Sequence, residues 1–167
     1  YMFNSCSSLA VLDIANWDVA NVTDMGYMFA YCSSLESLDV ADWNTSSVNA
    51  MAGMFIGCSS LETLNAANWQ IGQGINMGTM LADCSSLTTL DISQWSFNDK
   101  SSASTSSMFV NCASVSQACR VYSTLEAKEF LLDKAGETQM NPEWFIWDVD
   151  GEVAEVAYLV DGPTFNG

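Results

Sequence analysis

The chain has 167 residues, of which 49% are apolar, so it can bury a hydrophobic core and is not disordered by composition. Its 20 acidic and 4 basic residues give a net charge of −16, which argues against binding to nucleic acid or to an anionic membrane surface, because both require a basic face. Histidine is absent, which excludes Ser-His and Cys-His nucleophile arrangements and removes the commonest metal ligand.

The chain opens in the middle of a repeated pattern. Residues 1–3 read Tyr-Met-Phe and match residues 27–29, so we expect the chain to be a piece of a longer protein. Any export signal would then lie upstream of the first residue. No apolar run is long enough to span a bilayer, so we expect no membrane insertion in this segment.

A period of 26 residues organises the chain up to about residue 112. Cysteine, tryptophan and methionine recur at this interval in four copies, and a partial fifth copy follows a two-residue insertion in a serine-rich stretch. The three columns are Cys6, Cys32, Cys58 and Cys84; Trp17, Trp43, Trp69 and Trp95; and Met2, Met28, Met54 and Met80. Such a period is typical of a solenoid, in which each copy is one supersecondary unit and stacking the units builds the core.

Each repeat is predicted to contain a strand, a polar turn and a short helix. In the second copy, residues 35–40 read Leu-x-x-Leu-x-Val, which is the strand pattern of a leucine-rich repeat with three inward side chains. Residues 48–55 carry apolar side chains at spacings of three and four, which favours a short helix. We therefore predict an α/β fold for residues 1–119, a leucine-rich-repeat-like solenoid with one parallel sheet.

The cysteine and tryptophan columns are predicted to lie in the core. Neighbouring strands are ~4.8 Å apart, whereas a disulfide needs Cβ atoms ~3.8 Å apart, so we expect a row of free thiols. Cys119 lies outside the column and is the one candidate for a bridge, with Cys112 as its partner. A row of tryptophans can form a platform for sugars, but packing in the core is expected, with each indole N–H bonded to a neighbouring carbonyl group.

Residues 120–167 depart from the repeat and are predicted to form a C-terminal cap or a small α+β unit. After a last strand over residues 120–122, Ser123 and Glu126 have the spacing of a capping box, with Ser123 as the N-cap. The helix should run to Ala135 and stop at Gly136, because glycine commonly ends helices.

A β-hairpin is predicted to follow this helix. Its strands are expected over residues 144–149 and 153–160, joined by the Asp150-Gly151 turn. Exposure of Trp144 or Trp147 on this hairpin would indicate a binding surface.

One repeat position carries a column of acidic or amide side chains, and we expect it to face outward from the sheet. The column consists of Asp13, Asp39, Asn65 and Asp91. It is open to three interpretations: a structural ladder bonded to turn amides, a calcium site, or a solvated face that contacts a partner. Asp13 and Asp39 are the candidate calcium ligands, although calcium takes six to eight oxygen ligands and the sequence does not bring that many together.

Asp13 and Asp39 also permit an enzymatic interpretation. A retaining glycosidase uses two carboxyl groups ~5–5.5 Å apart, but almost any aspartate ladder in a solenoid would provide that distance. Arg120 is one of the few basic residues, and a shift of one residue near Ser116 would place it on the rung after Asp91, where it would neutralise the end of the ladder.

The repeated residues resemble a known bacterial family. Met28-Phe29, Cys32-Ser33-Ser34-Leu35, Leu38-Asp39 and Trp43, with their counterparts over residues 1–112, are similar to the bacterial surface protein 26-residue repeat of the BspA-like leucine-rich-repeat group. The resemblance implies an exported or surface-anchored protein of a host-associated or gut bacterium that acts in adhesion or host-ligand binding. It carries over no catalytic motif and names no ligand.

The sequence thus predicts a non-enzymatic, monomeric binding module at the bacterial cell surface, without a cofactor. The expected ligand is a protein or glycan outside the cell, recognised by the outward side chains of the sheet. These side chains are Glu36, Asp39, Asp13, Asp91, Glu62 and Asn65. Because this face is acidic, we expect a basic protein surface as the partner. The alternatives are a structural spacer that displays other domains and a carboxylate enzyme acting on polysaccharide.

Overall fold

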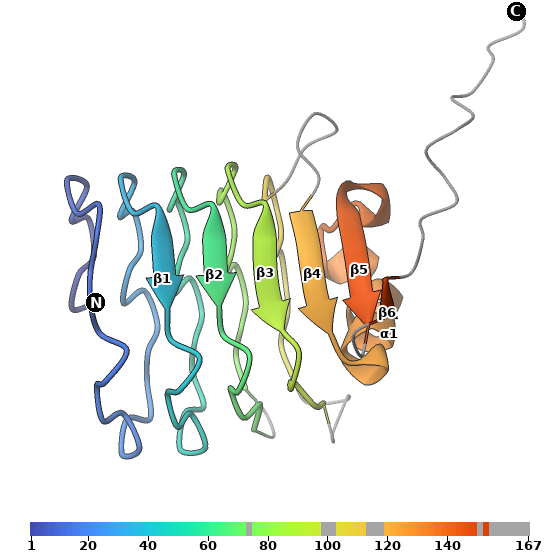
Figure 1. The fold of residues 1–167 in the computed structure, drawn as a ribbon, viewed down its shortest axis with the longest axis horizontal. Coiled ribbons are helices and arrows are strands. Elements are labelled where there is room, and N and C mark those ends of the chain that lie inside the picture. Colours follow the sequence, from blue (N-terminus) through green and yellow to red (C-terminus); the bar gives the residue numbers. More distant parts are fainter. Residues whose placement is uncertain (73–74, 98–102, 113–118, 150–151, 154–167) are drawn as a thin grey trace, which may run out of the picture.

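A computed structural model describes residues 1–72, 75–97, 103–112, 119–149 and 152–153. Within these residues, six strands form one sheet in chain order (Figure 1). They are β1 (Ser37–Asp39), β2 (Thr63–Asn65), β3 (Thr89–Ile92), β4 (Cys119–Ser123), β5 (Phe145–Val149) and β6 (Glu152–Val153). Strands β1 to β5 are parallel, and β6 pairs antiparallel with β5. The predicted α/β class with a parallel sheet is confirmed.

The sequence period determines the strand register. Leu38 on β1 pairs with Leu64 on β2, which pairs in turn with Leu90 on β3, so equivalent residues of successive repeats are neighbours. These three leucines are buried, whereas the residues on either side of Leu38 are exposed. Side chains alternate between the two faces of a strand, so each strand buries its leucine and presents its polar residues outward.

Turns form the wall opposite the sheet, so the prediction of a short helix at residues 48–55 and their counterparts was wrong. The described residues up to Cys112 contain no helix. Successive repeats are joined there by parallel bridges between Asp24, Ala50, Asn76 and Ser104. Backbone N–H groups bond to the next repeat, as the Met25 N–H does to the Ala50 carbonyl at 2.8 Å, and left-handed residues such as Gly53 (φ 59°) interrupt any helical turn.

The tryptophan column lies in the core, as predicted. Trp43, Trp69 and Trp95 are buried, and their indole N–H groups donate to the carbonyl groups of Ile14, Val40 and Ala66 in the preceding repeat. Trp17, in the first repeat, is 39% exposed. The buried rings cannot serve as a sugar platform.

All six cysteines are free thiols, and all except Cys6 are buried. The Cys112–Cys119 bridge is therefore not formed. Within the column, the Sγ–H groups of Cys58 and Cys84 donate to the carbonyl groups of Phe29 and Phe55 at 3.1 and 3.2 Å. The column acts as a row of small apolar side chains with weak donors.

Thiol reactivity provides a test of this arrangement. Burial raises the pKa of the Cys58 and Cys119 thiols to about 12, so both remain protonated at pH 8. We expect a dithiobis(nitrobenzoate) assay at that pH to find one fast-reacting thiol, Cys6, in the folded protein, and all six thiols after unfolding. Cys6→Ser should abolish the fast phase, whereas rapid labelling of a second thiol in the folded protein would contradict the buried column.

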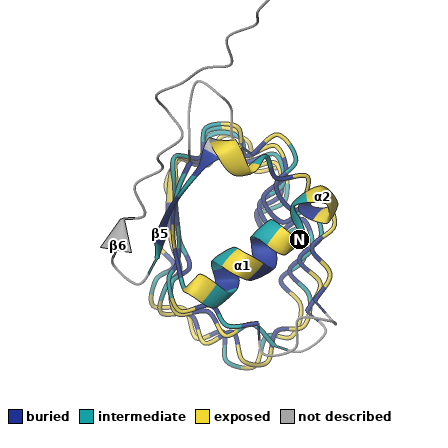
Figure 2. Ribbon diagram, turned by 90° about the vertical axis from the view of Figure 1, so that its right-hand side faces the viewer, coloured by how far each residue is buried: buried dark blue, intermediate teal, exposed yellow. Residues whose placement is uncertain are grey.

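Helix α1 (Leu125–Asp133) lies across the end of the core (Figure 2). It buries Ala127, Phe130 and Leu131. Its N-cap is Thr124, whose hydroxyl accepts the Ala127 N–H at 3.0 Å, so the predicted cap at Ser123 was one residue too early.

The predicted helix stop at Gly136 was also wrong. Gly136 lies inside the short helix α2 (Ala135–Thr138), and the chain turns at the left-handed Gln139 instead (φ 55°). A 3₁₀ helix, η1 (Pro142–Trp144), leads into β5. None of the helices in the described residues is both long and apolar enough to cross a membrane.

Strands β5 and β6 pair antiparallel, as predicted for a hairpin in this part of the chain. The expected turn at Asp150-Gly151 and residues 154–160 lie outside the described residues. Trp147 is buried and therefore offers no exposed binding surface; the side chain of Trp144 also lies outside the described part of the structure.

Candidate functional site

The outer side of the sheet brings together five of the six predicted site residues. Asp39, Asn65 and Asp91 are direct partners across β1, β2 and β3. Glu36 and Glu62 precede β1 and β2 and are linked by their backbones, with the Glu62 N–H donating to the Glu36 carbonyl at 2.8 Å. We call these five residues the acidic sheet face. Asp13, the sixth predicted residue, is exposed in the first repeat, where the structure contains no strand.

The side chains of Asp39, Asn65 and Asp91 end their strands. Each Oδ1 accepts the backbone N–H two residues further on, at 3.2, 3.3 and 3.0 Å respectively. This Asx turn bends the chain away from the sheet after each strand. The predicted structural ladder bonded to turn amides is therefore confirmed for these three residues.

Glu36 and Glu62 differ from this ladder. Both are exposed, and no side chain among the described residues forms an ion pair or a hydrogen bond with their carboxylates. Their backbones are held by the pairing of the repeats, so the two side chains start from neighbouring positions and their carboxylates remain available to a ligand. They are the strongest candidates for contact with a partner.

The first 99 residues contain no lysine or arginine, so no basic side chain within this stretch neutralises the acidic sheet face. Two described bases are already paired: Arg120 Nη1 lies 3.8 Å from Asp148 Oδ2, and Lys134 Nζ lies 2.8 Å from Glu137 Oε2. The field over the repeats is accordingly that of uncompensated carboxylates.

Arg120 does not occupy the predicted rung. The register places Tyr122 beside Asp91, whereas Arg120 pairs with Thr89. Arg120 still faces outward, because it is two residues from Tyr122, but its ion pair is with Asp148 on β5. Arg120 therefore neutralises Asp148 in the C-terminal part of the sheet, and it forms no ion pair with the acidic sheet face.

The described residues add no ligand cluster to the calcium interpretation, and strands β1 to β3 give the glycosidase interpretation no adjacent pair of ladder carboxylates. Within the described ranges, no three histidine, cysteine, aspartate or glutamate residues converge on a possible metal position. In the register of β1 to β3, Asn65 separates Asp39 from Asp91, so no two ladder carboxylates are adjacent on these strands.

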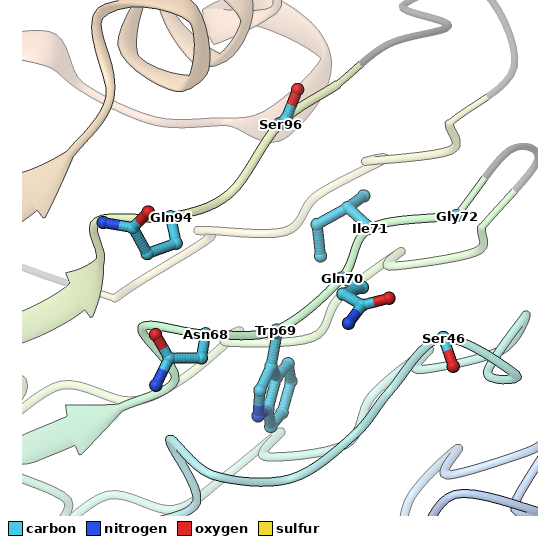
Figure 3. Close-up of a pocket in the computed structure, with 8 residues that line it drawn as sticks. All are labelled: Ser46, Asn68, Trp69, Gln70, Ile71, Gly72, Gln94 and Ser96. Atoms are coloured by element: carbon cyan, nitrogen blue, oxygen red, sulfur yellow. The ribbon is translucent and has the colours of Figure 1, made fainter.

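Sequence reasoning missed a depression beside the chain segments that follow β2 and β3 (Figure 3). Its volume is about 490 Å³. It is lined by Ser46, Asn68, Trp69, Gln70, Ile71, Gly72, Gln94 and Ser96. The signal in the sequence is a change of charge next to the tryptophan column, where Asp18 and Asp42 of the first two repeats give way to the amides Gln70 and Asn68 in the third.

The pairing of repeats defines the chain as an α/β repeat protein with a parallel sheet and an acidic outer face. The family model described as "Mycoplasma protein of unknown function, DUF285" matches residues 1–122, and the chain belongs to this family. No curated protein and no solved structure matches the chain. The family description assigns no ligand and no activity.

Proposed function

We propose that this protein is a non-enzymatic binding module of the bacterial cell surface that recognises a protein or glycan outside the cell through its acidic sheet face. We further infer that its repeats stack as a leucine-rich-repeat-like solenoid of the BspA-like group. The observation that carries the proposal is the pair of exposed, unpaired carboxylates of Glu36 and Glu62, in a stretch of 99 residues without a basic residue.

A basic protein surface fits this face best. Clustered carboxylates attract cationic partners and speed their encounter, and complementary charge selects against acidic partners. The backbones beneath the face are already paired between repeats, so binding of a partner has to order only the side chains.

Neutralising these two carboxylates tests the proposal. We expect Glu36→Gln/Glu62→Gln to weaken binding of a decalysine peptide about tenfold, because each exposed ion pair contributes up to ~1 kcal/mol. Isothermal titration calorimetry at low ionic strength measures the effect, which should shrink near ~0.15 M salt, where the Debye length falls to ~8 Å.

A matched control removes the same number of charges elsewhere. Glu129→Gln/Asp133→Asn lies on exposed positions of α1. Binding by this variant should match that of the unmodified protein. Equal losses in the two variants would mean that net charge alone attracts the peptide, and the acidic sheet face would not be the site.

A structural spacer is the second candidate function. The observation in its favour is that the Asx turns already account for Asp39, Asn65 and Asp91 without a ligand. Deleting one whole repeat, residues 37–62, separates the two functions. A spacer would still display other domains after the deletion. A binding face that depends on adjacent repeats would no longer bind the decalysine peptide.

A further inference from the structure

A second polar surface lies in the depression beside the turns that follow β2 and β3. Its walls come from three successive repeats, with Ser46 from the second, residues 68–72 from the third, and Gln94 and Ser96 from the fourth (Figure 3). Its volume of about 490 Å³ falls within the range of ~300–1,000 Å³ that is usual for small-molecule sites.

Three carboxamide side chains at this depression are available for a ligand. Asn68, Gln70 and Gln94 are exposed, and no described residue forms a hydrogen bond with their amide groups. Each amide group offers two donors and one acceptor. By contrast, the hydroxyl groups of Ser46 and Ser96 already donate to Asn44 Oδ1 and Glu126 Oε2.

The backbones that carry these carboxamides are fixed. The Gln70 N–H donates to Thr45 Oγ1 at 2.8 Å, and the Gln70 carbonyl accepts from the same hydroxyl at 3.1 Å. The Gln94 N–H donates to the Ala67 carbonyl at 3.1 Å. Binding therefore orders only the side chains, which keeps its entropic cost low.

The lining residues carry no charge, although the chain has a net charge of −16. An anionic ligand would be repelled by the molecule, and a cationic ligand would prefer the carboxylates of the acidic sheet face. Neutral hydroxyl groups, which both donate and accept hydrogen bonds, match the donors and acceptors of the carboxamides.

Two apolar side chains, Trp69 and Ile71, also line the depression. Trp69 is only 1% exposed, and its indole N–H is bonded to the Val40 carbonyl at 2.8 Å, so its ring offers almost no surface to a ligand. Ile71 is half-buried, so the accessible apolar surface of the lining comes from this side chain. A partly accessible apolar side chain flanked by exposed carboxamides suits a ligand that has both C–H and O–H faces. We propose that this depression binds a neutral saccharide, at a site separate from the acidic sheet face.

Nuclear magnetic resonance titration tests this proposal directly. The probes are maltohexaose, cellohexaose and the hexamer of N-acetylglucosamine, each added to the ¹⁵N-labelled protein. We expect at least one of them to shift the side-chain amide signals of Asn68, Gln70 and Gln94. If none of the three saccharides moves these signals at millimolar concentration, the proposal is overturned.

Variants locate the binding site. Asn68→Ala/Gln94→Ala should weaken saccharide binding about tenfold, because the variant loses the hydrogen bonds of two carboxamides. Asn16→Ala/Asn21→Ala is the matched control, because both residues are exposed amides in the first repeat. Unchanged affinity in the first variant would refute the assignment.

The two proposed sites can be tested independently. Glu36→Gln/Glu62→Gln should bind the saccharide as the unmodified protein does, and Asn68→Ala/Gln94→Ala should keep its affinity for decalysine. Loss of saccharide binding on neutralising Glu36 and Glu62 would place the saccharide on the acidic sheet face and overturn the separate site.

Discussion

Replacing Trp69 with alanine is expected to lower the free energy of unfolding by about 3–5 kcal/mol, the usual cost of removing a large buried aromatic side chain. Trp69 is 1% exposed, and its ring stacks on that of Trp95 with centroids 6.2 Å apart. Its indole N–H satisfies the Val40 carbonyl, so the substitution leaves both a cavity and a buried acceptor without its partner.

The same column provides the control for this prediction. Trp17 occupies the equivalent position in the first repeat but is 39% exposed, so Trp17→Ala should cost only about 1–2 kcal/mol. Urea denaturation followed by circular dichroism gives both values. A loss as large for Trp17→Ala as for Trp69→Ala would show that the column does not derive its stability from burial.

Gly53→Ala is expected to destabilise the fold by about 2–4 kcal/mol, through left-handed backbone strain and overpacking together. Gly53 has φ of 59°, and a Cβ atom there would lie 2.5 Å from Cε1 of Tyr27. The neighbouring repeats place Tyr27 and Thr79 at the same left-handed position, so the fold tolerates the backbone conformation. The close approach of the Tyr27 ring is what requires glycine here.

Two further variants separate these contributions. Gly136→Ala, in α2 and with no atom within 4 Å of the added Cβ, should be neutral or stabilise the fold by up to ~1 kcal/mol. The double variant Tyr27→Ala/Gly53→Ala should be more stable than the sum of the single losses predicts, because the ring is gone. Strict additivity in thermal unfolding would contradict the packing of Tyr27 on Gly53.

The parallel sheet was predictable from the sequence because its cause is local and repeated. Leu38, Leu64 and Leu90 recur at one interval with polar neighbours, and a register that pairs equivalent residues buries all three at once. The burial of the tryptophans and their bonds to carbonyl groups follow from the same stacking.

The opposite wall was not predictable from apolar spacing. The apolar residues within 48–55 have helical spacing, yet backbone N–H groups in this segment bond to carbonyl groups of the neighbouring repeat. The apolar spacing within one repeat contains no information about these bonds to the next repeat. The left-handed backbone at Tyr27 and Thr79 could not be predicted from the sequence either, because neither residue type favours that conformation.

The candidate site was predicted by position but not by role. The sequence placed Asp39 and Glu36 on one face, but only the structure shows that Asp39 ends its strand while Glu36 stays unpaired. The placement of Arg120 failed because the repeat decays before β4, so the period no longer sets the register there.

The central claim is that the acidic sheet face is the contact surface for a basic partner. Its most direct test is to map the backbone amide shifts of the ¹⁵N-labelled protein as decalysine is added. We predict the largest shifts at Glu36, Glu62 and the adjoining strands β1 and β2, with little change at Glu129 and Asp133 on α1. Shifts concentrated on α1, or spread evenly over all acidic residues, would contradict the claim.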